Sequence, residues 1–195
     1  TVWLILYLFL IVYELSNSLI SFRWNKEMGL LLENKKVGLI GFGRIGRRVS
    51  ELLAPFRCQI SFYDPRPDCE ATTAAAKSSL EALLRDSDIV SLHANVEPAS
   101  RPLLTENEFR TIKKGCFLIN TARGSLIDEK ALFQALERGH LQGAALDVFA
   151  NEPYQGPLNL LPNVIMTPHI GSYAKESRIQ MELEAVHNLL KGLAS

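Results

Sequence analysis

Residues 37–46 of the chain read Val37-Gly38-Leu39-Ile40-Gly41-Phe42-Gly43-Arg44-Ile45-Gly46, and this stretch decides the fold. The residues up to Ile40 are apolar or small, as expected for a strand buried on both faces of a parallel sheet. Gly41, Gly43 and Gly46 then fit the pattern G-x-G-x-x-G. That pattern suits a tight turn, a close approach of backbone to a pyrophosphate, and close helix packing. A helix beginning near Ile45 would point free N–H groups at phosphates, so the stretch predicts a dinucleotide site.

An acidic residue follows this turn at the distance that a dinucleotide fold requires. Residues 59–63 form the second expected strand, and Asp64 ends it 18 residues after Gly46. A carboxylate there accepts hydrogen bonds from ribose hydroxyls and repels a 2′-phosphate, which favours NAD over NADP. The alternative is an ordinary glycine turn with an Asp that caps the next turn. Spacing and strand context favour the nucleotide site.

Strands and helices alternate along the rest of the chain. We expect further strands at 88–93, 116–120, 144–149 and 164–167, and helices at 1–20, 45–54, 79–85, 129–138 and 174–191. Thr105 and Glu108 have the spacing of a capping box, which predicts that a further helix begins there. Gly115 is expected to end this helix. Asn34 suits a left-handed turn before the first strand. This order predicts an α/β fold with a doubly wound parallel sheet, the Rossmann dinucleotide-binding domain.

Composition narrows the function classes. The 195 residues carry 21 basic and 21 acidic side chains, so no net positive field exists to hold nucleic acid or an anionic membrane. Three cysteines, Cys58, Cys69 and Cys116, have no metal-ligand spacing, which favours reduced thiols in the cytoplasm and no metal site. The apolar run from Val2 to Tyr13 is too short to span a bilayer. We expect a buried or interface helix there, with a cropped membrane anchor as the alternative.

Three side chains that could act together in one reaction follow three successive strands. Arg123, Glu152 and His169 come after the fourth, fifth and sixth expected strands, at the edge where parallel sheets build their sites. A histidine can exchange a proton with a hydroxyl, and a paired Glu152 would orient it and favour its charged form. Arg123 can bind a carboxylate through a forked pair of hydrogen bonds. The set suits redox chemistry on a 2-hydroxy acid, with Asp147 placed to accept from a nicotinamide amide.

Each of these residues also has a purely structural interpretation. Arg123 can pair with Asp128 on the surface, Glu152 can be a solvated loop acid, and His169 can be a hydrogen-bonded residue at a strand end. His93 is either a neighbour of the cofactor or a plain strand-end residue. The arrangement of three such residues after three strands favours the functional interpretation.

The motifs resemble a known family, the NAD-dependent D-isomer-specific 2-hydroxyacid dehydrogenases. The resemblance rests on the glycine stretch and on three others: 118–124 (Leu-Ile-Asn-Thr-Ala-Arg-Gly), 146–153 (Leu-Asp-Val-Phe-Ala-Asn-Glu-Pro) and 167–171 (Thr-Pro-His-Ile-Gly). It implies Arg123, Glu152 and His169 as the catalytic residues. Together with the glycine motif and the strand-end His93, it gives the following expected NAD contacts: Gly41, Gly43, Arg44, Ile45, Gly46, Asp64, His93, Thr121, Ala122, Arg123, Asp147, His169, Gly171 and Ser172.

The resemblance also implies the organisation of the chain. Residues 37–172 are expected to form the NAD-binding domain, with 1–36 and 173–195 as connecting segments that lie near a homodimer interface. The family's substrate domain is largely absent from these residues. The chain looks most similar to the D-3-phosphoglycerate dehydrogenase branch. The alternatives are a hydroxypyruvate or glyoxylate reductase, and an NAD(H)-binding interaction module like a corepressor. The 195 residues alone are expected to bind NAD(H) and to turn over 2-oxo acids poorly.

Overall fold

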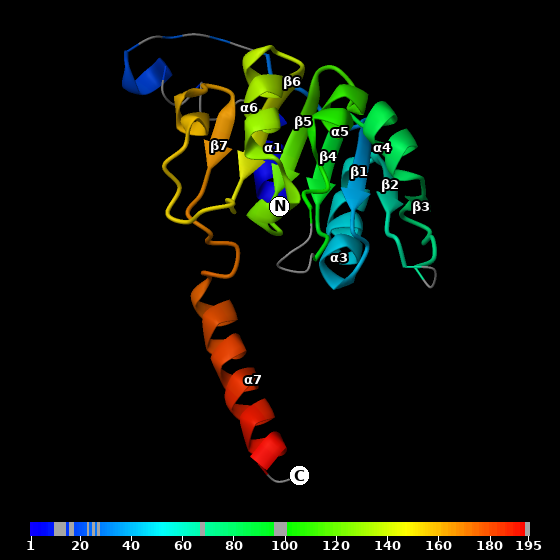
Figure 1. Ribbon diagram of the computed structural model, residues 1–195, viewed down its shortest axis with the longest axis vertical. Helices are drawn as coiled ribbons and strands as arrows, with labels where there is room; N and C mark the ends of the chain where they lie inside the picture. The colour runs from blue at the N-terminus through cyan, green and yellow to red at the C-terminus, as the bar shows by residue number, and fades with distance from the viewer. Residues whose placement is uncertain are drawn as a thin grey trace.

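A computed structural model describes residues 1–9, 15, 18–22, 24, 26, 28–66, 69–95 and 101–193. These residues contain a seven-stranded parallel sheet in the order β3-β2-β1-β4-β5-β6-β7 (Figure 1). The strands are β1 (Lys36–Ile40), β2 (Gln59–Tyr63), β3 (Ala76–Lys77), β4 (Ile89–Leu92), β5 (Cys116–Asn120), β6 (Leu141–Leu146) and β7 (Val164–Met166). The order reverses between β1 and β4, which confirms the predicted doubly wound fold.

Helices α1 (Val2–Phe9), α3 (Arg44–Leu53), α4 (Leu80–Asp86), α5 (Glu106–Thr111) and α6 (Glu129–Glu137) cover the two faces of the sheet. The chain also forms α7 (Lys175–Leu193) and short 3-10 turns at Ala54–Phe56, Gly124–Leu126 and Pro157–Leu160. The buried side chains of α1 and α3 share one apolar cluster with one face of the sheet. Those of α4, α5 and α6 share a second cluster with the other face.

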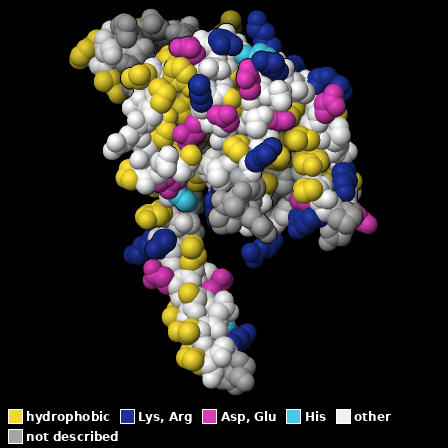
Figure 2. All heavy atoms as spheres, in the orientation of Figure 1, with side chains coloured by type: hydrophobic (Ala, Val, Ile, Leu, Met, Phe, Trp, Pro, Cys, Tyr) yellow, Lys and Arg dark blue, Asp and Glu magenta, His cyan; other side chains and the backbone are white. Residues whose placement is uncertain are grey.

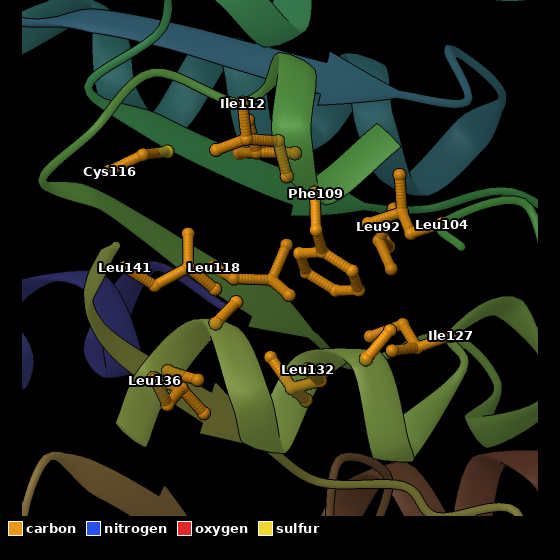
Figure 3. Packing of buried hydrophobic residues seen from close by; sticks show 14 of the residues in the cluster. Leu92, Leu104, Phe109, Ile112, Cys116, Leu118, Ile127, Leu132, Leu136 and Leu141 are labelled. Carbon is orange, nitrogen blue, oxygen red and sulfur yellow. The ribbon is translucent and has the colours of Figure 1, made fainter. Parts of the chain in front are cut away.

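The period of the strands explains why two cores form. In β5, Phe117 and Ile119 face the α1 and α3 side, whereas Cys116 and Leu118 face the α5 and α6 side. Figure 3 shows Leu118 between the buried side chains of α5 and α6. All five positions of β5 are buried and all but Asn120 at its end are apolar, which is why the sequence marks this strand clearly.

The N-terminal helix is part of this core. Leu4, Ile5, Leu8 and Phe9 of α1 are buried, and the ring of Phe9 lies 4.9 Å from that of Phe117. The expected helix over 1–20 is confirmed for 2–9 as a buried helix, while residues 10–14 lie outside the described ones. Among the residues that the structure describes, no helix combines the length and apolar character needed to cross a membrane.

Several boundaries differ from the expected ones. β6 begins and ends three residues before the predicted 144–149, because the chain leaves the sheet at Asp147, whose carboxylate binds the next loop. Gly115 does not close α5 as predicted. That helix ends at Thr111, because Ile112 adopts extended backbone, and Gly115 instead donates to His140 O in the turn before β5. The two-residue strand β3 was not predicted.

Other local predictions are confirmed. Asn34 has a φ of +64°, and the capping box of Thr105 and Glu108 is present. The long helix α7 extends away from the sheet and buries none of its side chains (Figure 1). Figure 2 shows hydrophobic side chains along it.

The glycine turn gives the first testable prediction. A Cβ on Gly46 would stand against the carbonyl oxygen of Gly41, well inside the 3.0 Å that real Cβ atoms keep, so Gly46→Ala must displace α3. We expect a loss of about 1–3 kcal/mol in the free energy of unfolding, measured in urea. Gly192→Ala is the control, since nothing lies within 4 Å of a Cβ there and alanine favours helix. Equal stability of the two variants would contradict this packing.

Candidate functional site

The glycine turn leaves backbone donors for an anion. Gly41 has a φ of +93° and Gly43 is the N-cap of α3, with no side-chain hydrogen bond that caps the helix. The first amides of a helix have no partner within it, so the start of α3 presents N–H groups and the positive end of its dipole. A cavity of about 500 Å³ opens beside them, lined by Gly43, Arg44, Ile45, Arg48, Val49 and His93. These residues fit a pyrophosphate.

His93 lies on the wall of this cavity, directly after β4. Its Nε2 is 2.9 Å from Ser91 Oγ, and burial lowers its pKa to about 4. The ring is therefore neutral at pH 7 and adds no charge to the phosphate site. The position of His93 on this wall agrees with its expected place beside the cofactor. Its contact with the cofactor stays a prediction.

Asp64 lies buried at the carboxyl end of β2, beside the glycine turn. Its Oδ2 accepts from Phe42 N at 2.8 Å, and Arg66 binds it through a forked pair of 2.9 Å hydrogen bonds. These Arg66 bonds hold the pKa of the Asp64 carboxyl well below its usual range. Arg66 was not predicted as a residue of the site. A cation two residues after the strand-end acid was the available signal.

A buried amide shapes the loop after β5. Asn120 Oδ1 accepts from Ala122 N at 3.0 Å, and its Nδ2 donates to Arg123 O at 2.9 Å. Asn120 is 1% exposed, and it holds residues 121–123 in a turn at the sheet edge. The alternative that Arg123 pairs with Asp128 is not observed, because Asp128 caps α6 through Lys130 N and Ala131 N.

Glu152 and His169 form the hydrogen-bonded pair that was expected from the sequence. His169 Nδ1 lies 2.8 Å from Glu152 Oε2, while Glu152 Oε1 accepts from Phe149 N at 3.0 Å. The hydrogen bond from His169, then the Phe149 amide and the charge of Arg123, lower the pKa of the Glu152 carboxyl. Glu152 is therefore ionised and accepts, so Nδ1 carries the hydrogen and Nε2 is left for other partners.

Asp147 is the residue that holds the turn carrying His169. Its Oδ1 accepts from Thr167 Oγ1 at 2.5 Å and from Ile170 N at 2.9 Å, and its Oδ2 accepts from Gly171 N at 2.9 Å. This carboxylate is 3% exposed. His169 has a φ of +52°, a backbone conformation that non-glycine residues adopt rarely. The hydrogen bonds on both sides of His169 stabilise this conformation.

Two cavities meet at His169. One of about 620 Å³ is lined by Ile45, Thr121, Arg123, Asp147 and residues 167 and 169–172, and also by Thr1, Trp3, Leu4 and Met181. The other, of about 640 Å³, has His169 and Glu152 on one side, with Tyr154, Met166 and Thr167 among its other walls. The structure thus brings the three predicted catalytic side chains to one place. Tyr154 and Thr167 were missed, although Thr167 stands at a strand end.

Comparison with known proteins identifies the family. The family model for the NAD binding domain of D-isomer specific 2-hydroxyacid dehydrogenases matches residues 2–171. The chain belongs to this family. NAD is therefore the cofactor that its glycine turn serves. A glyoxylate reductase of Aeropyrum pernix is 39% identical over 173 residues, which is 86% of this chain and 52% of that protein. The chain spans about half the length of the curated relatives that it matches.

Solved structures of similar dehydrogenases share the fold. The NAD-dependent formate dehydrogenase of Staphylococcus aureus, in complex with NAD, has a TM-score of 0.90 at 30% identity, covering 100% of this chain and 60% of that one. An acyclic imino acid reductase in complex with NADPH and D-Arg has a TM-score of 0.89 at 27% identity, covering 97% and 62%.

The hydrogen bonds of Asp147 give a second prediction. In Asp147→Asn the amide nitrogen cannot accept, so at least one of the donors from Thr167, Ile170 and Gly171 loses its partner. We expect a loss of about 1–3 kcal/mol in the free energy of unfolding, and faster hydrogen exchange at Ile170 N and Gly171 N. Asp86→Asn, at an exposed ion pair with Arg85, is the control and should change stability by less than about 0.5 kcal/mol. Unchanged exchange at 170–171 would refute the role of Asp147.

Proposed function

We propose that this domain serves an NAD-dependent oxidoreductase that interconverts small 2-oxo acids and D-2-hydroxy acids. The observation that carries the proposal is the pair of His169 and Glu152 at a cavity that Arg123 also lines. This cavity reaches Ile45 at the start of α3 and the turn at Gly171, so a cofactor bound over the glycine turn would extend toward His169.

The tautomer of His169 sets its chemistry. Because His169 Nδ1 donates its hydrogen to the Glu152 carboxylate, only Nε2 can exchange a proton with a substrate. During reduction, His169 Nε2 gives this proton to the carbonyl oxygen as the C=O bond becomes C–OH. In the oxidation direction, Nε2 takes the hydroxyl proton. Glu152 stabilises the charged ring that exists between these events, so it acts as a positioning and charge-balancing residue.

Arg123 supplies the binding of the acid group. One of its guanidinium nitrogens, Nη1, donates to Ala122 O at 2.7 Å, and the rest of the fork is available for a carboxylate. A forked pair fixes both the position and the plane of a 2-oxo acid, and it places positive charge beside the carbonyl. The nicotinamide, when bound, supplies or takes up the hydride.

We infer the substrate from the curated relatives of the chain. The similarity to a glyoxylate reductase at 39% identity favours glyoxylate or hydroxypyruvate over the phosphoglycerate that the sequence analysis put first. We therefore propose a glyoxylate-type reductase, with D-3-phosphoglycerate oxidation as the less favoured activity.

The assignment of the chain ends remains part of the proposal. We propose that 1–36 and 173–195 connect the NAD-binding body to other parts of the protein and lie near a homodimer interface. The support is α7, whose apolar side chains Ile179, Leu183, Val186 and Leu190 are all exposed. We also propose a cytoplasmic location, consistent with three free cysteines.

Turnover by the full-length gene product tests the proposed function. We expect glyoxylate reduction with NADH to exceed reduction of 3-phosphohydroxypyruvate, measured by loss of NADH absorbance. The 195 residues alone should bind NADH and reduce glyoxylate poorly, because half of the water-excluding cleft of this family is not among them. NADH binding by the full-length product without turnover of any 2-oxo acid would instead favour an interaction module. Rapid turnover by the 195 residues would contradict the need for a second domain.

The role of His169 gives a separate prediction. His169→Asn keeps a residue that tolerates the left-handed backbone and removes the group that exchanges the proton. We expect the turnover number of the full-length product to fall about 10²- to 10⁴-fold, with nearly unchanged NADH affinity by fluorescence titration. His187→Asn on the exposed helix α7 is the control. A loss shared equally by NADH binding and turnover would point to a structural role instead.

A further inference from the structure

The loop that carries Glu152 is held to the rest of the fold at few points. In the described part of the chain, residues 148–156 make two hydrogen bonds to side chains outside the loop. One joins Glu152 to His169 and belongs to the proposed proton transfer. The other runs from Ala150 N to Glu129 Oε1, over 2.7 Å, and comes from a different element, the helix α6.

Glu129 stands on a rigid support. It is the first residue of α6, and Asp128 caps that helix by accepting from two of its amides. The amide next to that of Ala150, Phe149 N, donates to the carboxylate of Glu152 at 3.0 Å. Two successive amides of the loop are therefore each bound by a carboxylate, one from α6 and the other from Glu152 itself. Hydrogen bonds to an ionised acceptor are the stronger kind, so both contacts favour one loop conformation.

The turn that carries Arg123 lies against the same stretch of backbone. A Cβ on Gly124 would overlap the carbonyl group of Phe149, so the two segments touch through bare main chain. The 3-10 turn that begins at Gly124 leads into α6. The Arg123 turn, the start of α6 and the Glu152 loop thus pack as one unit, and Glu129 supplies the hydrogen bond between its helix and the loop.

We propose that Glu129 is a positioning residue for the proton transfer, because its hydrogen bond to Ala150 N sets the loop conformation in which Glu152 reaches His169. The inference rests on the proposed function, since the reaction is the one assigned to His169. Without this acceptor the loop keeps its packing against Gly124, but Glu152 loses its fixed position. The Nδ1–H of His169 then lacks a steady partner, and the ring no longer presents Nε2 to the substrate in one orientation. NADH binding, which uses the glycine turn, does not change.

Three substitutions separate this hydrogen bond from the negative charge at the start of α6. Glu129→Ala removes both. Glu129→Asp keeps the charge that the helix dipole favours, but its side chain is one methylene shorter and does not reach Ala150 N. Glu129→Gln removes the charge and keeps an oxygen that accepts. In the full-length product we expect Glu129→Ala and Glu129→Asp to lower kcat for glyoxylate about tenfold at unchanged NADH affinity, and Glu129→Gln to retain most of it.

The tautomer of His169 gives a second readout, which needs no turnover. Histidine nitrogens of the full-length product are labelled with nitrogen-15, and the His169 signal is identified by its loss in His169→Asn. At a pH at which the ring is neutral, we expect the hydrogen at Nδ1 in the unsubstituted protein and in Glu129→Gln. In Glu129→Ala the population should shift toward Nε2–H. Glu137→Ala, at the other end of α6 and exposed, is the matched control and should change neither readout.

The pattern of the variants decides the inference. Full activity in Glu129→Asp beside a loss in Glu129→Gln would assign the effect to the charge at the helix start and overturn it. An unchanged kcat and tautomer in Glu129→Ala would overturn it as well, and Glu129→Asp replaces that variant if the alanine protein does not fold. The expected tautomer shift in a full-length product that reduces no 2-oxo acid would refute the proposed function and leave the contact between Glu129 and the loop standing.

Discussion

The structure depends on one close approach of backbone to backbone, between the start of α3 and the turn that follows β1. Gly46 lies against the carbonyl oxygen of Gly41, and Gly41 in turn lies against the backbone of residues 93–94. No Cβ fits at either contact. Because this packing fixes where α3 begins relative to the ends of β1 and β4, it also fixes where the unpaired helix amides point. The nucleotide site is therefore built by main-chain packing before any side chain contributes.

The side chains of the site are positioned by buried polar residues, which lie at three strand ends. Asp64 after β2, Asn120 at the end of β5 and Asp147 after β6 are all buried, and each binds backbone amides of a loop at the same edge of the sheet. A buried polar group costs free energy unless its partners are present, so each of these residues disfavours other loop conformations. Arg123 and His169 owe their positions to Asn120 and Asp147.

This division explains what could be predicted from the sequence. The central strands were found because burial on both faces leaves them continuously apolar, and the turn because only glycine fits there. Arg123, Glu152 and His169 were found because parallel strands deliver their following residues to one edge. The early end of β6 and the pairing of β3 were missed, since both depend on tertiary hydrogen bonds that have no local pattern. The side-chain hydrogen bonds of Asp147 to the turn of residues 167–171 were missed for the same reason, and its expected contact with the nicotinamide stays a prediction.

Asp64 shows the limit of inferring selectivity from one residue type. The rule that a strand-end acid selects NAD treats the carboxylate as an isolated negative charge. Here a guanidinium lies at hydrogen-bond distance from both oxygens, so the carboxylate is one half of an ion pair. The same carboxylate also accepts from Phe42 N of the glycine turn, so Asp64 holds the turn in place as well as the Arg66 side chain. The residue type alone therefore does not give the role of Asp64, because its contacts with Phe42 N and Arg66 are structural as well.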